Sequence, residues 1–207
     1  MIPSQIAVFI GSPIEHESER AVLLELLRLL EESGETATVM VNLNLKGRQL
    51  DLVVGTDRLT LVLEAKASTV PLSGTTNGPW IAHTRSGRSR TTGNAYAQAL
   101  GEKNALCSAL RDFLGEVEGY PDAHVVFVPE LAEGSQLSFD FKVSYGGIGG
   151  LATQLTGRSE LRCSADQWRA FALRHGLEQV FDLTCALDPR SLDAQRTLAR
   201  YVAAFTA

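Results

Sequence analysis

Asp51, Glu64 and Lys66 place two carboxylates and an ammonium group within one short stretch of the chain. Carboxylate oxygens bind hard cations, and Mg²⁺ takes a few of them while keeping several of its waters. A lysine beside such a cation can contact a metal-bound water or a phosphate oxygen. The three side chains are therefore suited to a divalent cation with a phosphate group beside it, provided that the fold brings them together.

The stretch that carries them predicts a β-hairpin with strands over 49–55 and 59–67, because turn-forming residues around Asp57 separate two β-rich runs. A shorter and a longer loop both place Asp51 directly opposite Glu64. Facing carboxylates repel each other, which costs stability unless something such as a cation lies between them. A polar sheet face with a chance cluster of charges is the alternative interpretation of the same pattern.

Side-chain alternation along the hairpin predicts one polar and one apolar face. The polar face carries Gln49, Asp51, Val53, Thr60, Val62, Glu64 and Lys66. The apolar face is expected to lie on the core with Leu50, Leu52, Val54, Leu59, Leu61, Leu63 and Ala65. A slip by one residue would bury the charges, so the pattern specifies the register.

The composition is that of an ordinary globular protein, with 44% hydrophobic and 21% charged residues. The net charge of −5 provides no global basic field for nucleic acid, although local patches can still bind phosphate. The three widely spaced cysteines argue against a thiolate zinc site and fit a reducing compartment. With no recognisable signal peptide and no membrane-length apolar run, we expect a cytoplasmic protein.

The remaining pattern predicts an α/β fold, with a small mixed sheet and helices on both of its faces. Strands are expected at 36–46, 80–83, 123–129 and 138–144, and helices at 13–33, 95–114, 164–176 and from 188 onwards. The segment 68–79 is expected to be a loop, and the glycine-rich segment 145–150 a flexible turn.

Two of these helices begin with polar side chains. Stepping back by helical spacing from Leu26 and Leu23 leads to Glu19, at the edge of the buried face, where a carboxylate can point into a cleft. An exposed acid favoured by the helix dipole is the alternative for Glu19. Gln98 lies in the first turn of the helix at 95–114.

The densest positive segment of the chain contains Arg85, Arg88 and Arg90, and it follows Trp80. Its other residues are mainly Ser, Gly and Thr. It either contacts bound phosphate or forms a solvated loop. We consider Trp80 and the three arginines as candidates for binding nucleic acid.

A helical Glu, an Asp on one strand, Glu-x-Lys on the next strand and a helix with an early Gln together resemble the PD-(D/E)XK nuclease superfamily, and most closely its nuclease-related (NERD) domain. The matching pieces are Ser18-Glu19-Arg20, Gln49–Val54, Leu63–Lys66, Gly78-Pro79-Trp80 and Asn94–Gln98. The similarity covers about residues 15–130. The chain departs from the pattern at Leu50 and Ala95, where the family pattern has proline.

The resemblance implies a restriction-endonuclease-like core, which we place over 1–135. The segment that follows matches no known pattern, and we expect it to form an α/β extension over 136–207 that packs on the same domain as a lid, dimerisation element or tether. The resemblance also implies hydrolysis of phosphodiester bonds, usually in DNA, with Mg²⁺ or Mn²⁺. Asp51 and Glu64 would hold the cation, with Glu19 as a third acid. Lys66 would orient the attacking water or stabilise charge, and Gln98 would position the water or Lys66.

Two other interpretations stay open. The fold could be a catalytically inactive module that binds nucleic acid or a partner protein, although a decayed site usually loses one of its key side chains and this chain keeps them. A different enzyme class would need a phosphate loop or an activated nucleophile, and the only glycine-rich stretch lacks the lysine of a phosphate loop. The expected partners are nucleic acid, with DNA as the expected type, and either a second copy of the chain or a partner domain.

Overall fold

The computed structural model describes residues 5–84, 86–115 and 117–182. In chain order its elements are β1 (Ile6–Ile10), α1 (Glu17–Ser33), β2 (Ala37–Leu45), β3 (Arg48–Gly55), β4 (Thr60–Ala67), β5 (Leu72–Gly74), β6 (Trp80–His83), β7 (Ser89–Thr92), α2 (Ala95–Leu114), β8 (Asp122–Val128), β9 (Gln136–Leu137), β10 (Ser144–Gly147), η1 (Ile148–Gly150), α3 (Leu151–Leu155), α4 (Ala165–Arg174) and β11 (Glu178–Val180). None of the described helices is long and apolar enough to cross a membrane.

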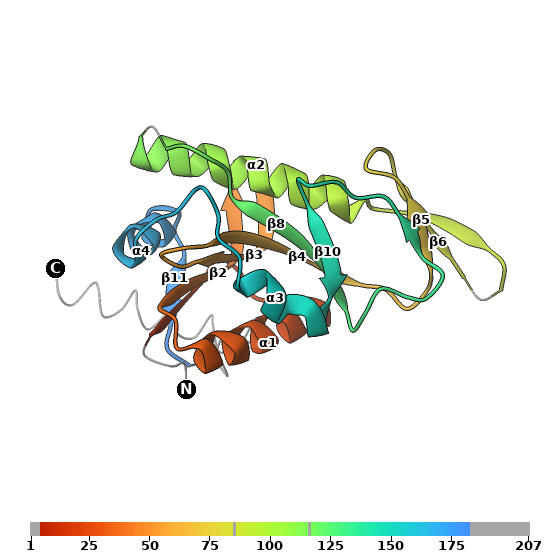
Figure 1. Ribbon diagram of the computed structural model, residues 1–207, viewed down its shortest axis with the longest axis horizontal. Coiled ribbons are helices and arrows are strands. Elements are labelled where there is room, and N and C mark those ends of the chain that lie inside the picture. Colours follow the sequence, from red (N-terminus) through yellow and green to blue (C-terminus); the bar gives the residue numbers. More distant parts are fainter. Residues whose placement is uncertain (1–4, 85, 116, 183–207) are drawn as a thin grey trace.

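A large mixed sheet forms the centre of the molecule, in the strand order β10-β8-β4-β3-β2-β1-β11 (Figure 1). Strands β2, β3 and β4 pair antiparallel, whereas β1 with β2, β4 with β8 and β8 with β10 pair parallel. A second sheet of four short strands, β7-β6-β5-β9, extends from one end of the molecule. The mixed sheet between helices confirms the predicted α/β class and is compatible with a restriction-endonuclease-like core.

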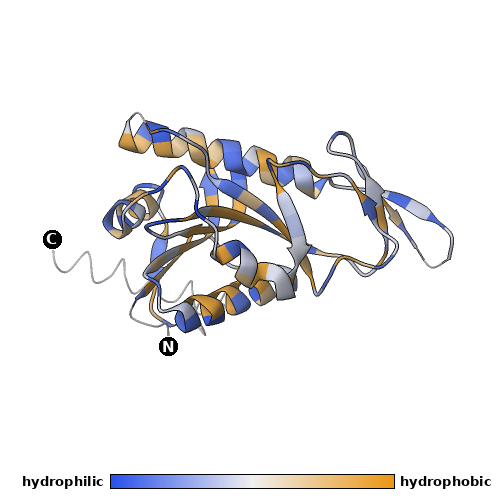
Figure 2. Ribbon diagram, viewed as in Figure 1, coloured by the Kyte–Doolittle hydropathy of each residue, from blue (hydrophilic) through white to orange (hydrophobic). Residues whose placement is uncertain are grey.

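Two apolar clusters hold the layers together. Helices α1 and α3 pack on one face of the sheet, and α2 and α4 pack on the other. In Figure 2 the helices turn their hydrophobic sides towards the sheet. The strands in the middle of the sheet are therefore covered on both sides, as is usual for strands flanked by helices.

This double cover corrects one prediction for the hairpin. Val53 and Val62, on the face expected to be polar, are fully buried beneath α2. Leu50 joins them there, whereas Leu52 lies in the cluster beneath α1, so the two leucines do not share a face. Side-chain alternation therefore reverses at the residue between them, Asp51.

Several predicted boundaries are confirmed. Helix α2 begins after Asn94, whose side chain accepts a hydrogen bond from the Ala97 backbone N–H, and ends before Gly115. Helix α1 ends at Gly34, which is left-handed with φ 68°. The capping box of Ser164 and Gln167 opens α4 as predicted. The helix expected from 188 onwards lies outside the described residues.

Helix α1 begins later than predicted, at Glu17. The residues predicted to start the helix, from Ser12 on, are held in another conformation. The Asn42 side chain donates hydrogen bonds to the backbone oxygens of Ser12 and Pro13, which holds this segment against β2 in an extended connection. The prediction also missed β1, a fully buried apolar run that pairs with β2.

The prediction for 138–150 is wrong. Strand β10 forms later than expected, over part of the segment predicted to be a flexible turn, and it pairs with β8. Residues Ser144–Gly147 pair parallel with His124–Phe127 of the buried strand β8. Segment 68–79 likewise contains a short strand, β5.

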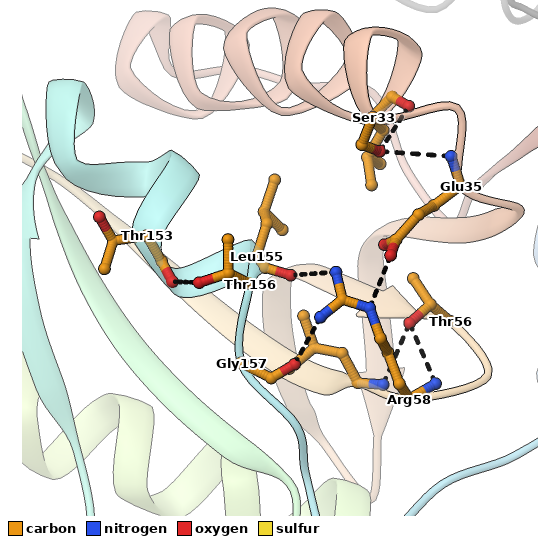
Figure 3. Close-up of polar contacts among 10 residues, drawn as sticks. Ser33, Glu35, Thr56, Arg58, Thr153, Leu155, Thr156 and Gly157 are labelled. Atoms are coloured by element: carbon orange, nitrogen blue, oxygen red, sulfur yellow. Dashed lines mark hydrogen bonds and ion pairs between the residues drawn. The ribbon is translucent and has the colours of Figure 1, made fainter.

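The turn of the β3–β4 hairpin is fixed by Arg58 (Figure 3). Its guanidinium donates to the Glu35 carboxylate at 2.6 Å and to the backbone oxygens of Leu155 and Gly157, each at 2.9 Å. The Thr56 hydroxyl accepts hydrogen bonds from two backbone N–H groups of the same turn. One side chain thus ties the hairpin to the α1–β2 connection and to the end of α3.

Candidate active site

The hairpin register is the predicted one. Regular pairs run from Gly55 with Thr60 to Leu52 with Leu63, and the Thr56 N–H donates to the Leu59 oxygen at 2.8 Å. Continuing this register places Asp51 opposite Glu64.

The sheet becomes irregular at Asp51. In the pairing of β3 with β2, Leu52 lies opposite Val41 and Leu50 lies opposite Leu43. Asp51 and Asn42, which lie between these pairs, are not paired regularly. Asn42 has a φ of 52°, an uncommon value for a residue with a side chain. On its other side, Asp51 accepts a hydrogen bond from the Ala65 backbone N–H through Oδ2 at 3.0 Å. Such irregularities re-aim side chains, and this one turns a carboxylate towards the end of β4.

Five of the predicted site residues line one open cleft of about 400 Å³. Glu19 comes from the first turn of α1, and Gln98 from the first turn of α2. Asp51 lies on β3, and both Glu64 and Lys66 lie on β4. His16, Ser18 and Gln49 complete its polar lining.

Glu64 is the most enclosed of the carboxylates in the cleft, with 1% of its surface exposed. Its Oε2 accepts a hydrogen bond from Gln98 Nε2 at 2.9 Å. Its Oε1 lies 3.7 Å from Lys66 Nζ, whose side chain is partly exposed. One carboxylate is thus fixed by an amide on one oxygen and approached by an ammonium group on the other.

Burial and mutual repulsion raise the proton affinity of these acids. Burial, reinforced by Asp51, raises the pKa of Glu19 to about 6. Burial also raises the pKa of Asp51, although the Ala65 N–H opposes the effect. The pKa of Glu64 is raised furthest, first by burial and then by the charges of Asp51 and Glu102. Carboxyl groups that are buried and repel each other have strongly shifted pKa values, and such shifts are common at functional sites.

Glu102 is a member of this cluster that sequence reasoning missed. It is fully buried on α2, and neither of its carboxylate oxygens has a hydrogen-bond partner. Burial and the charge of Asp51 raise its pKa to about 7. A signal was present in the sequence, because Glu102 falls at helical spacing between Ala99 and Leu106 in the buried stripe of α2.

Within the part of the chain that the structure describes, no three His, Cys, Asp or Glu side chains are already grouped around one point as metal ligands. The donor set nevertheless suits a hard cation. Asp51 and Glu64 supply oxygens beside an open cleft, and Mg²⁺ needs only one or two carboxylates when waters and substrate phosphates complete its shell. Both Glu102 oxygens are buried without a hydrogen-bond partner, and this acid adds to the negative charge around Asp51 that a cation in the cleft would offset.

The candidates for binding nucleic acid separate in the structure. Arg90 lines a hollow that Lys66 also lines, directly beside the cleft. Arg88 is exposed at the turn between β6 and β7. Arg85 lies outside the described residues.

Trp80 has no exposed ring face on which a base could stack, so the structure does not support it as a stacking residue for nucleic acid. Its side chain is fully buried, its ring packs against Phe127 and Phe139, and its indole N–H donates to the Thr75 oxygen at 3.0 Å. The tryptophan anchors the second sheet to the main sheet instead of presenting a stacking surface.

A family model described as the nuclease-related domain matches residues 14–129, more than half of the chain. The chain belongs to the nuclease-related domain family. The predicted resemblance is thereby confirmed, and the matched nuclease-related domain includes all the residues that line the cleft. Comparison with curated proteins and with solved structures gave no match.

Proposed function

We propose that this protein is a divalent-metal-dependent nuclease that hydrolyses phosphodiester bonds in nucleic acid, with DNA as the expected substrate. The observation that carries the proposal is the convergence of five side chains on one open cleft, from helix α1, the β3–β4 hairpin and helix α2. Membership of the nuclease-related domain family supports the reaction class.

Asp51 and Glu64 would hold Mg²⁺ or Mn²⁺, with Glu19 contributing from α1. When bound, such a cation lowers the pKa of water and neutralises charge on a phosphate group. Glu64 must give up a proton to serve as a ligand, because burial and its acidic neighbours raise its pKa. Binding of the cation is therefore coupled to proton release.

Gln98 and Lys66 prepare the site from either side of Glu64. The Gln98 amide holds Oε2 and so fixes the orientation of the carboxylate plane. The Lys66 ammonium group lies near Oε1 and is partly open to the cleft. It would stabilise negative charge as that charge grows on the phosphate during attack by water.

The surroundings supply positive potential that the whole protein, with its net charge of −5, does not. The first turns of α1 and α2 both border the cleft through Glu19 and Gln98. Helix N-termini carry partial positive charge and favour phosphate. Arg88 and Arg90 add formal charge on the neighbouring β6–β7 hairpin.

Cleavage of plasmid and linear DNA in Mg²⁺, Mn²⁺ or EDTA tests the proposal. The intact protein should cut only with a metal, and Asp51→Ala and Lys66→Ala should each remove cutting while keeping the fold. Asp57→Ala removes an exposed carboxylate from the turn of the same hairpin and should leave activity unchanged. DNA binding that survives both site substitutions, with no cleavage under any condition, would instead establish an inactive binding module.

A further inference from the structure

A second hollow, of about 170 Å³, lies beside the acidic cleft. Lys66 and Ala67 line both, so the two are contiguous at the end of β4. One wall of the second hollow is the segment 68–70 that follows β4. The other wall comes from β6 and β7, with Arg90 as its charged member. We call it the Arg90 hollow.

The two hollows carry opposite charge. Three carboxylates line the cleft, from Glu19, Asp51 and Glu64. Among the described residues that line the Arg90 hollow there is neither Asp nor Glu, whereas Lys66 and Arg90 are both cationic. Hydroxyl-bearing residues complete its polar lining, namely Ser68, Thr69 and Thr92. A site of this composition favours an anion, and arginine is well suited to the oxygens of phosphate.

Strand register explains why Arg90 belongs to this hollow. Arg90 pairs with Ala82 in the β6–β7 hairpin, and Thr92 pairs with Trp80. Ala82 and Trp80 are buried, whereas the intervening Ile81 is exposed on the opposite face. Arg90 therefore projects on the side of the hairpin that faces β4.

The floor of the hollow is well fixed. The Trp80 ring stacks on Phe127 of β8, and its indole N–H is bonded to Thr75. Gly74 makes room for this ring, because a Cβ at that position would lie 2.3 Å from Trp80 Cδ1. The position of Arg90 is thus tied to that of the main sheet and of Lys66.

We propose that the Arg90 hollow binds a phosphate group adjacent to the one that is cleaved, so that the substrate is a polynucleotide with consecutive phosphates rather than an isolated phosphodiester. Lys66, on the boundary between the hollows, lies between the two phosphate positions. This inference rests on the proposed nuclease function. It distinguishes Arg90, which lines the hollow, from Arg88, which does not.

Binding of a short fluorescein-labelled DNA, measured by anisotropy in EDTA over a series of salt concentrations, tests the site without cleavage. Arg90→Ala should weaken binding about tenfold and reduce the salt dependence by about one counterion. Arg88→Ala should reduce the affinity for DNA clearly less than Arg90→Ala does. Arg169→Ala removes an exposed arginine from α4 and serves as the control for net charge. Equal losses of DNA affinity for Arg88→Ala and Arg90→Ala would mean that the two arginines act only through a general positive charge, and would refute a specific phosphate site in the Arg90 hollow.

Hydrolysis in Mg²⁺ or Mn²⁺ provides the second measurement. For DNA, Arg90→Ala should raise KM about tenfold with little change in kcat, because the contact is made equally in ground and transition states. For bis(p-nitrophenyl) phosphate, which has a single phosphodiester, Arg90→Ala should change KM far less than it does for DNA. Equal impairment on both substrates would refute the inference. If the intact protein cuts neither substrate, the nuclease proposal fails, while a binding loss specific to Arg90 still supports the hollow.

Discussion

Replacing Glu102 by glutamine should stabilise the metal-free protein, because it removes a buried carboxylate whose oxygens have no partners. The pKa of Glu102 is raised from 4.5 to about 7, mainly by burial and the charge of Asp51. A raised carboxyl pKa means that the folded state must hold a proton that the unfolded state has released. Each unit of pKa difference corresponds to about 1.4 kcal/mol, so the full penalty is about 3 kcal/mol.

Because the pKa of Glu102 is raised in the folded state, its destabilising effect increases with pH. Below pH 4.5 the carboxyl group is protonated in both states and carries no penalty. The penalty grows as the pH rises from 4.5 and is complete above about 7. Glu102→Gln should therefore match the intact protein at pH 4 and exceed it at pH 8. For a chain of this size, about 3 kcal/mol corresponds to a Tm higher by roughly 6–12 °C.

Thermal unfolding in EDTA at several pH values measures this difference directly. Glu133→Gln changes an exposed glutamate in the same way and should leave Tm unchanged. A Glu102→Gln variant that is less stable than the intact protein at every pH would refute the reasoning. That result would mean that the carboxylate is well satisfied where it lies and that the acids in this cluster do not repel each other.

Three further predictions concern the packing that supports the site. Trp80→Ala should lower the free energy of unfolding by about 3–5 kcal/mol in a urea titration, because a fully buried aromatic ring is lost. Gly74→Ala should lower it by about 1–3 kcal/mol, since the new Cβ collides with the Trp80 ring, and an unchanged midpoint would contradict the packing described. Arg58→Ala should cost about 2 kcal/mol through the loss of three hydrogen bonds, while DNA cleavage measured well below the unfolding transition should stay unaltered because the turn lies at the far end of the hairpin.

Local chemistry made much of the fold predictable. Asn94 and Gly115 mark the ends of α2 through ordinary capping, and turn residues with β-rich flanks locate the β3–β4 hairpin. Long-range packing decided the rest. Strand β10 forms by parallel pairing with β8, from Ser144 opposite His124 to Gly147 opposite Phe127, a long-range contact that no local pattern records. The start of α1 depends on Asn42, which holds a segment from another part of the chain.

The site shows the same division. Asp51, Glu64 and Lys66 could be placed together because the turn of the hairpin determines the register of its two strands. The burial of Glu64 could not be predicted, because it depends on α2 covering a sheet face that looked polar in the sequence. Trp80 was misassigned for a related reason, because an aromatic beside a basic segment resembles a stacking surface until its burial is known.

Calorimetric titration of the metal-free protein with Mn²⁺ at neutral pH, in two buffers that differ in ionisation enthalpy, tests the carboxylate site most directly. The structure predicts binding of the cation with release of protons, because the raised pKa of Glu64 keeps that group protonated until the metal arrives. Asp51→Asn should abolish the binding heat, and Asp57→Asn should not. Absence of binding by the intact protein, or equal binding by the Asp51→Asn variant, would contradict the proposed role of these carboxylates.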